Sequence, residues 1–180
     1  ESADFYFNRG YKKGEEGDYY GAISDYSKVI EINPRNAVAY YNRGLATQLV
    51  FEKTCEDQLI QPTFITDHPR ETSPLCKQTR QNPELIERFE VFINGWEIAN
   101  AYSELNDPVI QRRLMEEQVE RGRGGEKDTH PLDEDFLRAM EYGMPPMGGV
   151  GFGIDRIVML LTDQSTIRDV ILFPTMRTEF

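Results

Sequence analysis

The sequence predicts an α+β fold in which an antiparallel sheet follows an N-terminal α-helical hairpin. Three observations support this prediction. Small and aromatic residues recur at helical spacing up to Pro34, strand-like segments joined by tight turns follow, and short helical patterns are mixed with those strands. Antiparallel hairpins mixed with helices favour an α+β layer over a parallel, doubly wound sheet.

The N-terminal segment contains an internal repeat. Residues 37–44 have the same pattern of small and aromatic residues as residues 3–10. The offset matches the ~34-residue period of the tetratricopeptide (TPR) repeat, which this segment resembles. We therefore predict two amphipathic helices around a turn at Gly17, ended by Pro34, and then the first helix of a second repeat. We assign residues 1–46 to this TPR-like helical hairpin.

The repeat is lost after Ala46, although the helical pattern continues toward Leu59 and is ended by Pro62. We therefore place the join between two unrelated sequences inside a continuous helix, near residues 45–47. Helical repeats normally need about three neighbours to bury their faces, so the hairpin must pack on the rest of the chain or on another molecule. Residues 47–180 form the second predicted domain.

Beyond the join, strand and turn patterns predominate. Strands are predicted at 63–66, 89–93 and 96–105, because Asn94 followed by Gly95 is a strong signal for a type I′ hairpin turn. The later predicted elements are helices at 108–121 and 133–142, a break at Gly122, Gly124 and Gly125, an apolar helix at 157–161 and a strand at 170–173.

Two glutamates of the predicted hairpin are candidate metal ligands. With a two-residue turn, Phe92 pairs with Glu97, and Glu90 shares the face of Phe92. Neighbouring carboxylates repel each other unless a positive charge lies between them, and a divalent cation that holds phosphate oxygens would supply that charge. The alternative is a pair of solvated glutamates on an exposed sheet face.

Three polar residues alternate on the returning strand and therefore share a face: Asn100, Tyr102 and Glu104. An aromatic ring flanked by an amide and a carboxylate could hold an alkyl chain that ends in an ammonium group. Strict alternation puts Glu97 on the opposite face, so one common site requires a β-bulge between Glu97 and Asn100. An ordinary polar strand face is the alternative.

A glycine-rich segment is the third candidate. Gly149, Gly151 and Gly153 alternate, which on a strand strips one face of side chains so that a flat ligand can lie against the backbone. Arg156 falls in the first turn of the following helix, where the helix dipole disfavours a cation unless it meets an anion such as a triphosphate. The alternative is a kinked strand followed by a surface arginine.

Composition narrows the possible classes of protein. The formal net charge of −11 disfavours the broad basic surface that binds a phosphate backbone. No segment approaches the ~18 apolar residues that cross a bilayer, and the N-terminus shows no basic-then-apolar leader, so we expect a cytoplasmic protein without a membrane partner. Cys55 and Cys76 lack metal-ligand spacing and are predicted to be buried free thiols. His68 and His130 are assigned structural or surface roles.

Five segments together resemble the bacterial-type lysyl-tRNA synthetases, a class II family: 61–69, 88–95, 97–107, 143–156 and 167–174. The resemblance extends from about Ala46 to the end of the sequence. It implies the C-terminal half of a class II catalytic domain, and therefore only part of the antiparallel sheet that is typical of that class.

The resemblance also implies roles for the candidate residues. Those that would hold Mg²⁺ together with the phosphates of ATP are Glu90 and Glu97. Those that would contact lysine are Asn100, Tyr102 and Glu104, with Glu104 pairing with the side-chain ammonium. The residues of the third signature motif are Gly149, Gly151, Gly153 and Arg156. In this motif the arginine would meet the nucleotide as a catalytic residue.

The sequence also departs from the family pattern. Trp96 stands where the family usually has arginine, and Met147 where it usually has a small residue, so we expect an altered pocket rim. Neither the anticodon-binding barrel nor the first and second signature motifs can be recognised. The second motif supplies an arginine that stabilises the transition state at the α-phosphate, and one missing charge of this kind costs ~10² to 10³ in rate.

The leading hypothesis is a lysine–tRNA ligase-family protein that activates lysine with ATP and Mg²⁺ and aminoacylates tRNA. As a partial catalytic domain, the chain is expected to be inactive or nearly so alone, and tRNA is a partner only if the missing domains are supplied. One alternative is a non-catalytic binding or scaffold module whose TPR hairpin recruits a protein partner. A recombined gene product without a selected function is the other.

Overall fold

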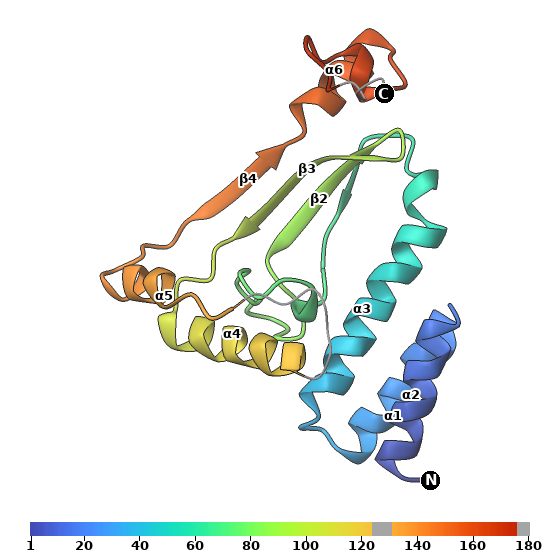
Figure 1. Ribbon diagram of the computed structural model, residues 1–180, viewed down its shortest axis with the longest axis vertical. Coiled ribbons are helices and arrows are strands. Elements are labelled where there is room, and N and C mark those ends of the chain that lie inside the picture. The colour runs from blue at the N-terminus through green and yellow to red at the C-terminus, as the bar shows by residue number, and fades with distance from the viewer. Residues whose placement is uncertain (124–130, 176–180) are drawn as a thin grey trace, which may run out of the picture.

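The computed structural model describes residues 1–123 and 131–175. Three N-terminal helices lie along one side of a four-stranded antiparallel sheet, and further helices lie at two ends of the sheet (Figure 1). The predicted α+β class with an antiparallel sheet is confirmed.

The N-terminal helices are α1 (Ala3–Glu15), α2 (Tyr19–Ile32) and α3 (Ala37–Thr54). Each begins at a residue whose side chain accepts a hydrogen bond from a backbone N–H of the first turn: Ser2, Asp18 and Asn36. Gly17 adopts a φ of +84° in the turn between α1 and α2. The predicted helical hairpin is therefore present, whereas its TPR character stays a prediction.

A buried carboxylate joins α1 to α2. The side chain of Asp25 is only 3% exposed and accepts hydrogen bonds from Arg9 at 2.6 and 2.8 Å, while Lys13 Nζ lies 2.9 Å away. The hydrogen bond from Arg9 is the largest influence on this carboxyl, and together with Lys13 it lowers the pKa of Asp25 to about 2. Charge pairing therefore contributes to the hairpin in addition to apolar packing.

This pairing predicts acid sensitivity. The pKa of Asp25 is about 2 when folded and 3.8 for the ordinary group, so its charge stabilises the fold fully above about pH 4 and progressively less toward about pH 2. We expect Asp25→Asn to cost about 1–3 kcal/mol at neutral pH, and that difference to shrink on acidification. Urea unfolding of both chains across this range measures the effect, with the exposed Asp4→Asn as control. A pH-independent difference would contradict the expectation.

Helix α3 is continuous through residues 45–47, as predicted. It ends at Thr54, earlier than the predicted run toward Leu59, and the 3₁₀ turn η1 (Glu56–Gln58) follows. The next residues reach the tip of the β-hairpin, where the backbone N–H of Gly95 donates to the carbonyl of Leu59 at 3.0 Å. Since α3 spans the proposed boundary without interruption, it can hold the N-terminal helices against the sheet region.

The sheet consists of β1 (Thr63–Ile65), β2 (Arg88–Ile93), β3 (Trp96–Ser103) and β4 (Gly148–Phe152), hydrogen-bonded in that order. The 3₁₀ turn η2 (Arg70–Thr72) lies between β1 and β2 and packs on α3. Asn94 and Gly95 both have positive φ, of 57° and 72°, which confirms the predicted type I′ turn. The hairpin that carries most candidate residues is therefore correctly predicted.

One extra residue interrupts the regular pairing of the hairpin. Phe92 is opposite Glu97, but Val91 is opposite Ala99, so Ile98 has no residue directly across from it. This is the β-bulge that a common site requires between Glu97 and Asn100. The bulge shifts the alternation of β3 by one residue relative to β2.

The remaining helices are α4 (Pro108–Arg123), α5 (Glu134–Glu141), α6 (Ile154–Thr162) and the 3₁₀ turn η3 (Ile167–Asp169). Asp107 accepts hydrogen bonds from the first turn of α4, as predicted, and Asp133 accepts one from the first turn of α5. Helix α4 continues through Gly122, where a break was predicted. Gly124 and Gly125 lie outside the described residues, as does His130.

The predicted strand at 170–173 is wrong. Val170 closes η3, and the following residues form no strand. The side chains of Leu172 and Phe173 are 89% and 91% exposed, so no described strand or core covers them. An apolar run specifies a strand only where a partner strand is available. Among the cysteines, Cys76 is buried as predicted, whereas Cys55 is exposed, contrary to the prediction.

Candidate functional site

The bulge places six predicted site residues on one face of the sheet. Because paired residues share a face, Glu90 lies with its partner Asn100, and Glu97 lies with its partner Phe92. The same face continues onto β4, where Asn100 pairs with Gly151 and Tyr102 pairs with Gly149. The sequence could specify that a bulge was needed, and the structure supplies it at Ile98.

Glu90 and Glu97 line one cavity of about 350 Å³ between α3 and this sheet face. Two further carboxylates, which the sequence analysis did not identify, also line it: Glu52 at the end of α3 and Glu56 in η1. We call these four glutamates and their cavity the acidic cavity. It combines residues that are distant in sequence because α3 crosses the sheet.

The charges of the acidic cavity act on one another. Burial is the main cause that raises the pKa of Glu90, and the negative charges of Glu97, Glu56 and Glu52 raise it further. Burial, followed by Glu52, Asp57 and Glu97, raises the pKa of Glu56. A cation bound among these carboxylates would relieve this repulsion.

Arg88 and His68 flank Glu90 and were given no functional role by the sequence analysis. Arg88 Nη2 donates to Glu90 Oε1, and His68 Nε2 lies 4.0 Å from Glu90 Oε2. Both side chains are largely buried, and burial, followed by the charge of Arg88, lowers the pKa of His68. The Arg-x-Glu spacing on β2 does place Arg88 on the face of Glu90, and this was the signal that could have identified it.

Residues of the predicted lysine contacts lie further along the same face. Tyr102 and Gly149 line a second cavity, of about 490 Å³, together with Arg88. The carboxylate of Glu104 lies over Gly149, because a Cβ built on that glycine would be 2.8 Å from Glu104 Oε1. The backbone N–H of Glu104 donates to the carbonyl of Met147 at 3.0 Å, so the unusual methionine does border this region.

The contact between Glu104 and Gly149 yields a prediction. In Gly149→Ala the new methyl group would displace the flexible end of Glu104 while leaving the backbone in place. We expect unchanged folding stability and about tenfold weaker binding of lysine. Gly151→Ala is a matched control, since its nearest neighbour would be 3.9 Å away. Calorimetric titration of both variants measures the difference, and equal lysine affinity in the two would contradict the expectation.

Two carbonyl groups at the bulge hold the start of α6. The N–H of Gly153 donates to the carbonyl of Ile98 at 2.9 Å, and Arg156 Nη1 donates to the carbonyl of Glu97 at 2.6 Å. Arg156 is exposed and is not one of the residues that line the acidic cavity. Its charge nevertheless lowers the pKa of Glu56, against the larger effect of burial. Arg156 therefore lies at the edge of the acidic cavity and not in its wall.

The donor set determines which metal would fit. Within residues 1–123 and 131–175, no three His, Cys, Asp or Glu side chains are arranged to hold a metal ion by themselves. Mg²⁺ in nucleotide sites is usually held by one or two carboxylates, with phosphate oxygens and water completing the shell. Glu90 and Glu97 therefore fit a Mg²⁺ ion that arrives with a phosphate ligand.

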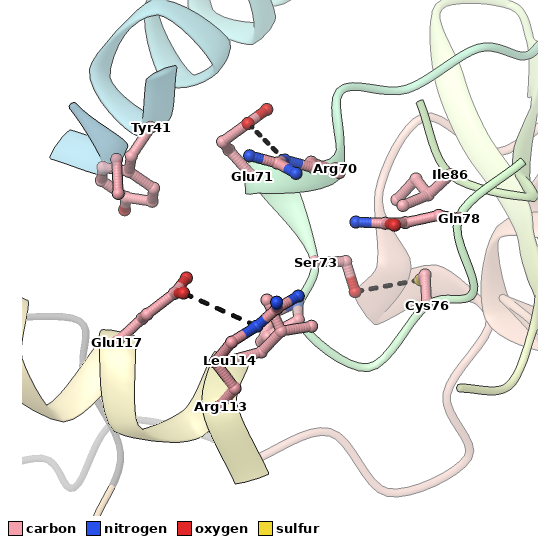
Figure 2. Close-up of a pocket in the computed structure, with 12 residues that line it drawn as sticks. Tyr41, Arg70, Glu71, Ser73, Cys76, Gln78, Ile86, Arg113, Leu114 and Glu117 are labelled. Atoms are coloured by element: carbon pink, nitrogen blue, oxygen red, sulfur yellow. Dashed lines mark hydrogen bonds and ion pairs between the residues drawn. The ribbon is translucent and has the colours of Figure 1, made fainter. Parts of the chain in front are cut away.

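A third cavity, of about 180 Å³, lies where α3, η2 and α4 meet and contains none of the predicted site residues (Figure 2). The thiol of Cys76 donates to the hydroxyl of Ser73 at 3.0 Å in its wall, and Arg70 pairs with Glu71 at 2.9 Å. Each of these two pairs satisfies its own polar groups.

Comparison with known proteins identifies the class. Residues 18–177 match the family described as tRNA synthetases class II (D, K and N). The chain therefore belongs to this family. The matched range begins before the predicted boundary at residues 46–47, which stays a prediction.

The relatives are lysine–tRNA ligases. The ligase of Moorella thermoacetica is 52% identical over 88% of this chain, that of Azobacteroides pseudotrichonymphae 58% over 72%, and that of Saccharolobus solfataricus 51% over 84%. These matches cover 34%, 26% and 30% of the respective relatives, so the chain spans about a third of their length or less. Across the described part of the chain, no helix is long and apolar enough to span a membrane.

Proposed function

We propose that the chain is part of a lysine–tRNA ligase and carries binding groups for lysine and for ATP with Mg²⁺. The reaction joins the carboxylate of lysine to the α-phosphate of ATP with release of pyrophosphate, and then transfers the lysyl group to tRNA with release of AMP. The observation that carries the proposal is the bulge at Ile98, because it gathers Glu97, Glu90 and Asn100 on one face. The names of the relatives support lysine as the amino acid.

Glu90 and Glu97 are the proposed metal ligands. Bound there, Mg²⁺ would neutralise charge on the phosphates of ATP. Two carboxylates on adjacent strands, one of them largely buried, provide a fixed pair of oxygen ligands. Gly149 and Gly151 form the proposed floor for the nucleotide, because β4 lacks side chains on that face. Gly153 lies outside β4, at the residue before α6, and is proposed to extend this floor. Arg156 is proposed to meet the phosphates from the edge.

Asn100, Tyr102 and Glu104 are the proposed contacts to lysine. Glu104 would pair with the side-chain ammonium, and the Tyr102 ring would contact the alkyl chain. Burial, followed by the charge of Glu104, raises the pKa of Tyr102, so its hydroxyl stays protonated and can donate. The strand therefore offers one carboxylate, one ring and one amide in sequence along a single face.

Isolated residues 1–180 are expected to show little or no turnover, because the arginine of the second signature motif is not recognisable among them. Lysine-dependent exchange of pyrophosphate into ATP tests this expectation, and robust exchange would contradict it. Calorimetric titration with lysine and with ATP tests binding separately. Failure to bind either ligand would overturn the proposed function and favour a non-catalytic scaffold.

The metal ligands can be tested by charge removal. We expect Mg²⁺ to strengthen the binding of ATP to the unmodified chain about tenfold, and to have no effect on the double variant Glu90→Gln, Glu97→Gln. The matched control is Glu116→Gln, Glu117→Gln, which removes two charges from α4. Titration with ATP in the presence and absence of MgCl₂ measures the effect, and an unchanged response of the site variant would exclude these ligands.

The N-terminal hairpin is proposed to be a TPR unit that contacts a protein partner. The 34-residue correspondence of Gly10 and Gly44 supports this, because both positions have close neighbours: Asp25 and Tyr26 at Gly10, and Glu71 at Gly44. In the first unit, α2 packs against α1 at Gly10. In the second unit, the turn η2, which contains Glu71, packs against α3 at the corresponding Gly44. A cytoplasmic location is proposed on the same grounds as the ligase function.

A further inference from the structure

Arg88 lies between the two halves of the proposed site. Its side chain is 14% exposed and belongs to the walls of both the acidic cavity and the neighbouring cavity that contains Tyr102. Nη2 donates to Glu90 Oε1, and Nε donates to Asn100 Oδ1 at 3.2 Å. One guanidinium thus connects a proposed metal ligand with a proposed lysine contact.

The chemistry of the guanidinium determines how both partners are oriented. Arginine has five N–H donors and no acceptor, so the atom of Asn100 that faces it must be the amide oxygen. The two N–H donors of the Asn100 amide are then left for another partner. At Glu90, Oε1 is engaged and Oε2 remains available, with His68 at 4.0 Å.

We propose that Arg88 is a positioning residue that couples Glu90 to Asn100, holding the amide so that its nitrogen donates to the bound substrate. The proposal rests on the ligase function above. It specifies that the substrate group at Asn100 is an acceptor, such as a carboxylate or phosphate oxygen, and not the lysine ammonium.

A lysine could not replace this arginine fully. Two parallel nitrogens of a rigid planar fork reach two partners at once, whereas an ammonium is a single point charge on a flexible stem. Arg88→Lys should therefore keep the charge beside Glu90 and weaken the connection to Asn100. Arg88→Met should remove both the charge beside Glu90 and the hydrogen bond to Asn100.

The positioning of Asn100 can be measured without ligand. The side-chain amide signals of Asn100, assigned by their absence in Asn100→Ser, are observed by nuclear magnetic resonance at one neutral pH, and the ¹⁵N relaxation of the amide reports how rigidly it is held. We expect a rigid amide in the unmodified chain, a more mobile one in Arg88→Lys and the most mobile one in Arg88→Met. An equally rigid amide in Arg88→Met, or a mobile amide in the unmodified chain, would overturn the proposal.

A control separates this effect from loss of structure. Arg112→Met, which removes a surface arginine paired with Glu134, must leave the mobility of the Asn100 amide unchanged. If Arg88→Met does not fold, Arg88→Lys decides the outcome.

A ligand titration keeps this proposal distinct from the proposed function. We expect Arg88→Lys to weaken lysine binding about tenfold. Undiminished lysine binding in Arg88→Lys would contradict the positioning role. If the unmodified chain does not bind lysine, the proposed function fails, while the relaxation experiment still decides whether Arg88 holds the Asn100 amide.

Discussion

Replacement of Phe92 by alanine is expected to lower the free energy of unfolding by about 3–5 kcal/mol. The side chain is 2% exposed, and its ring packs edge-on against Phe51 of α3 with 5.7 Å between the centroids. Its loss would leave a cavity between the helix and the sheet, next to Glu90 and Glu97. Because small domains are stable by only about 5–15 kcal/mol, this is a large effect. Urea denaturation followed by circular dichroism measures it.

Phe64→Ala provides the matched control. Phe64 lies on the edge strand β1, is 64% exposed, and contacts Phe89 at 5.4 Å between ring centroids. Deleting a side chain that is mostly in water should cost well under half as much. Similar losses in the two variants would show that the contact between α3 and the sheet is not the main source of stability in this region.

Glu104→Gln is expected to weaken lysine binding by about 10- to 100-fold. The variant keeps the shape of the side chain and removes its charge, so an ammonium bound there would lose its ion partner. Calorimetric titration with lysine measures the affinity. Titration with norleucine, which has no terminal amine, should show no difference between variant and unmodified chain.

Glu141→Gln, on the exposed side of α5, controls for the general effect of a lost negative charge on a chain of net charge −11. It should leave lysine affinity unchanged. If Glu104→Gln behaves in the same way, Glu104 is not the partner of the ammonium, and the proposed direction of lysine along β3 would have to be reversed.

The hairpin was predictable because its geometry is local. The turn residues Asn94 and Gly95 fix the pairing of Phe92 with Glu97, and the requirement for a bulge follows from counting residues between Glu97 and Asn100. Capping residues such as Asp107 and Asp133 were predictable for the same reason. Each depends only on side chains within a few residues of one another.

Other features depend on contacts between distant segments and could not be predicted from spacing. Glu52 and Glu56 join the site only because α3 packs across the sheet through Phe51. The apolar run at 170–173 fits a strand pattern, but the described sheet provides it with no partner. Arg156 was predicted as a site residue from its place in the first helical turn. Its hydrogen bond to the Glu97 carbonyl could not be predicted, because it arises from the bulge.

The unpaired residue at 98 makes the length of β3 as important as its composition. Removing Ile98 would restore regular alternation and exchange the inward and outward positions of the residues on one side of it. It would also remove the carbonyl that accepts from Gly153 and reorient the Glu97 carbonyl that accepts from Arg156. Such a chain would keep all the proposed ligands in their order and still lack the site. We therefore expect single-residue gaps between Glu97 and Asn100 to be tolerated less well than most substitutions there.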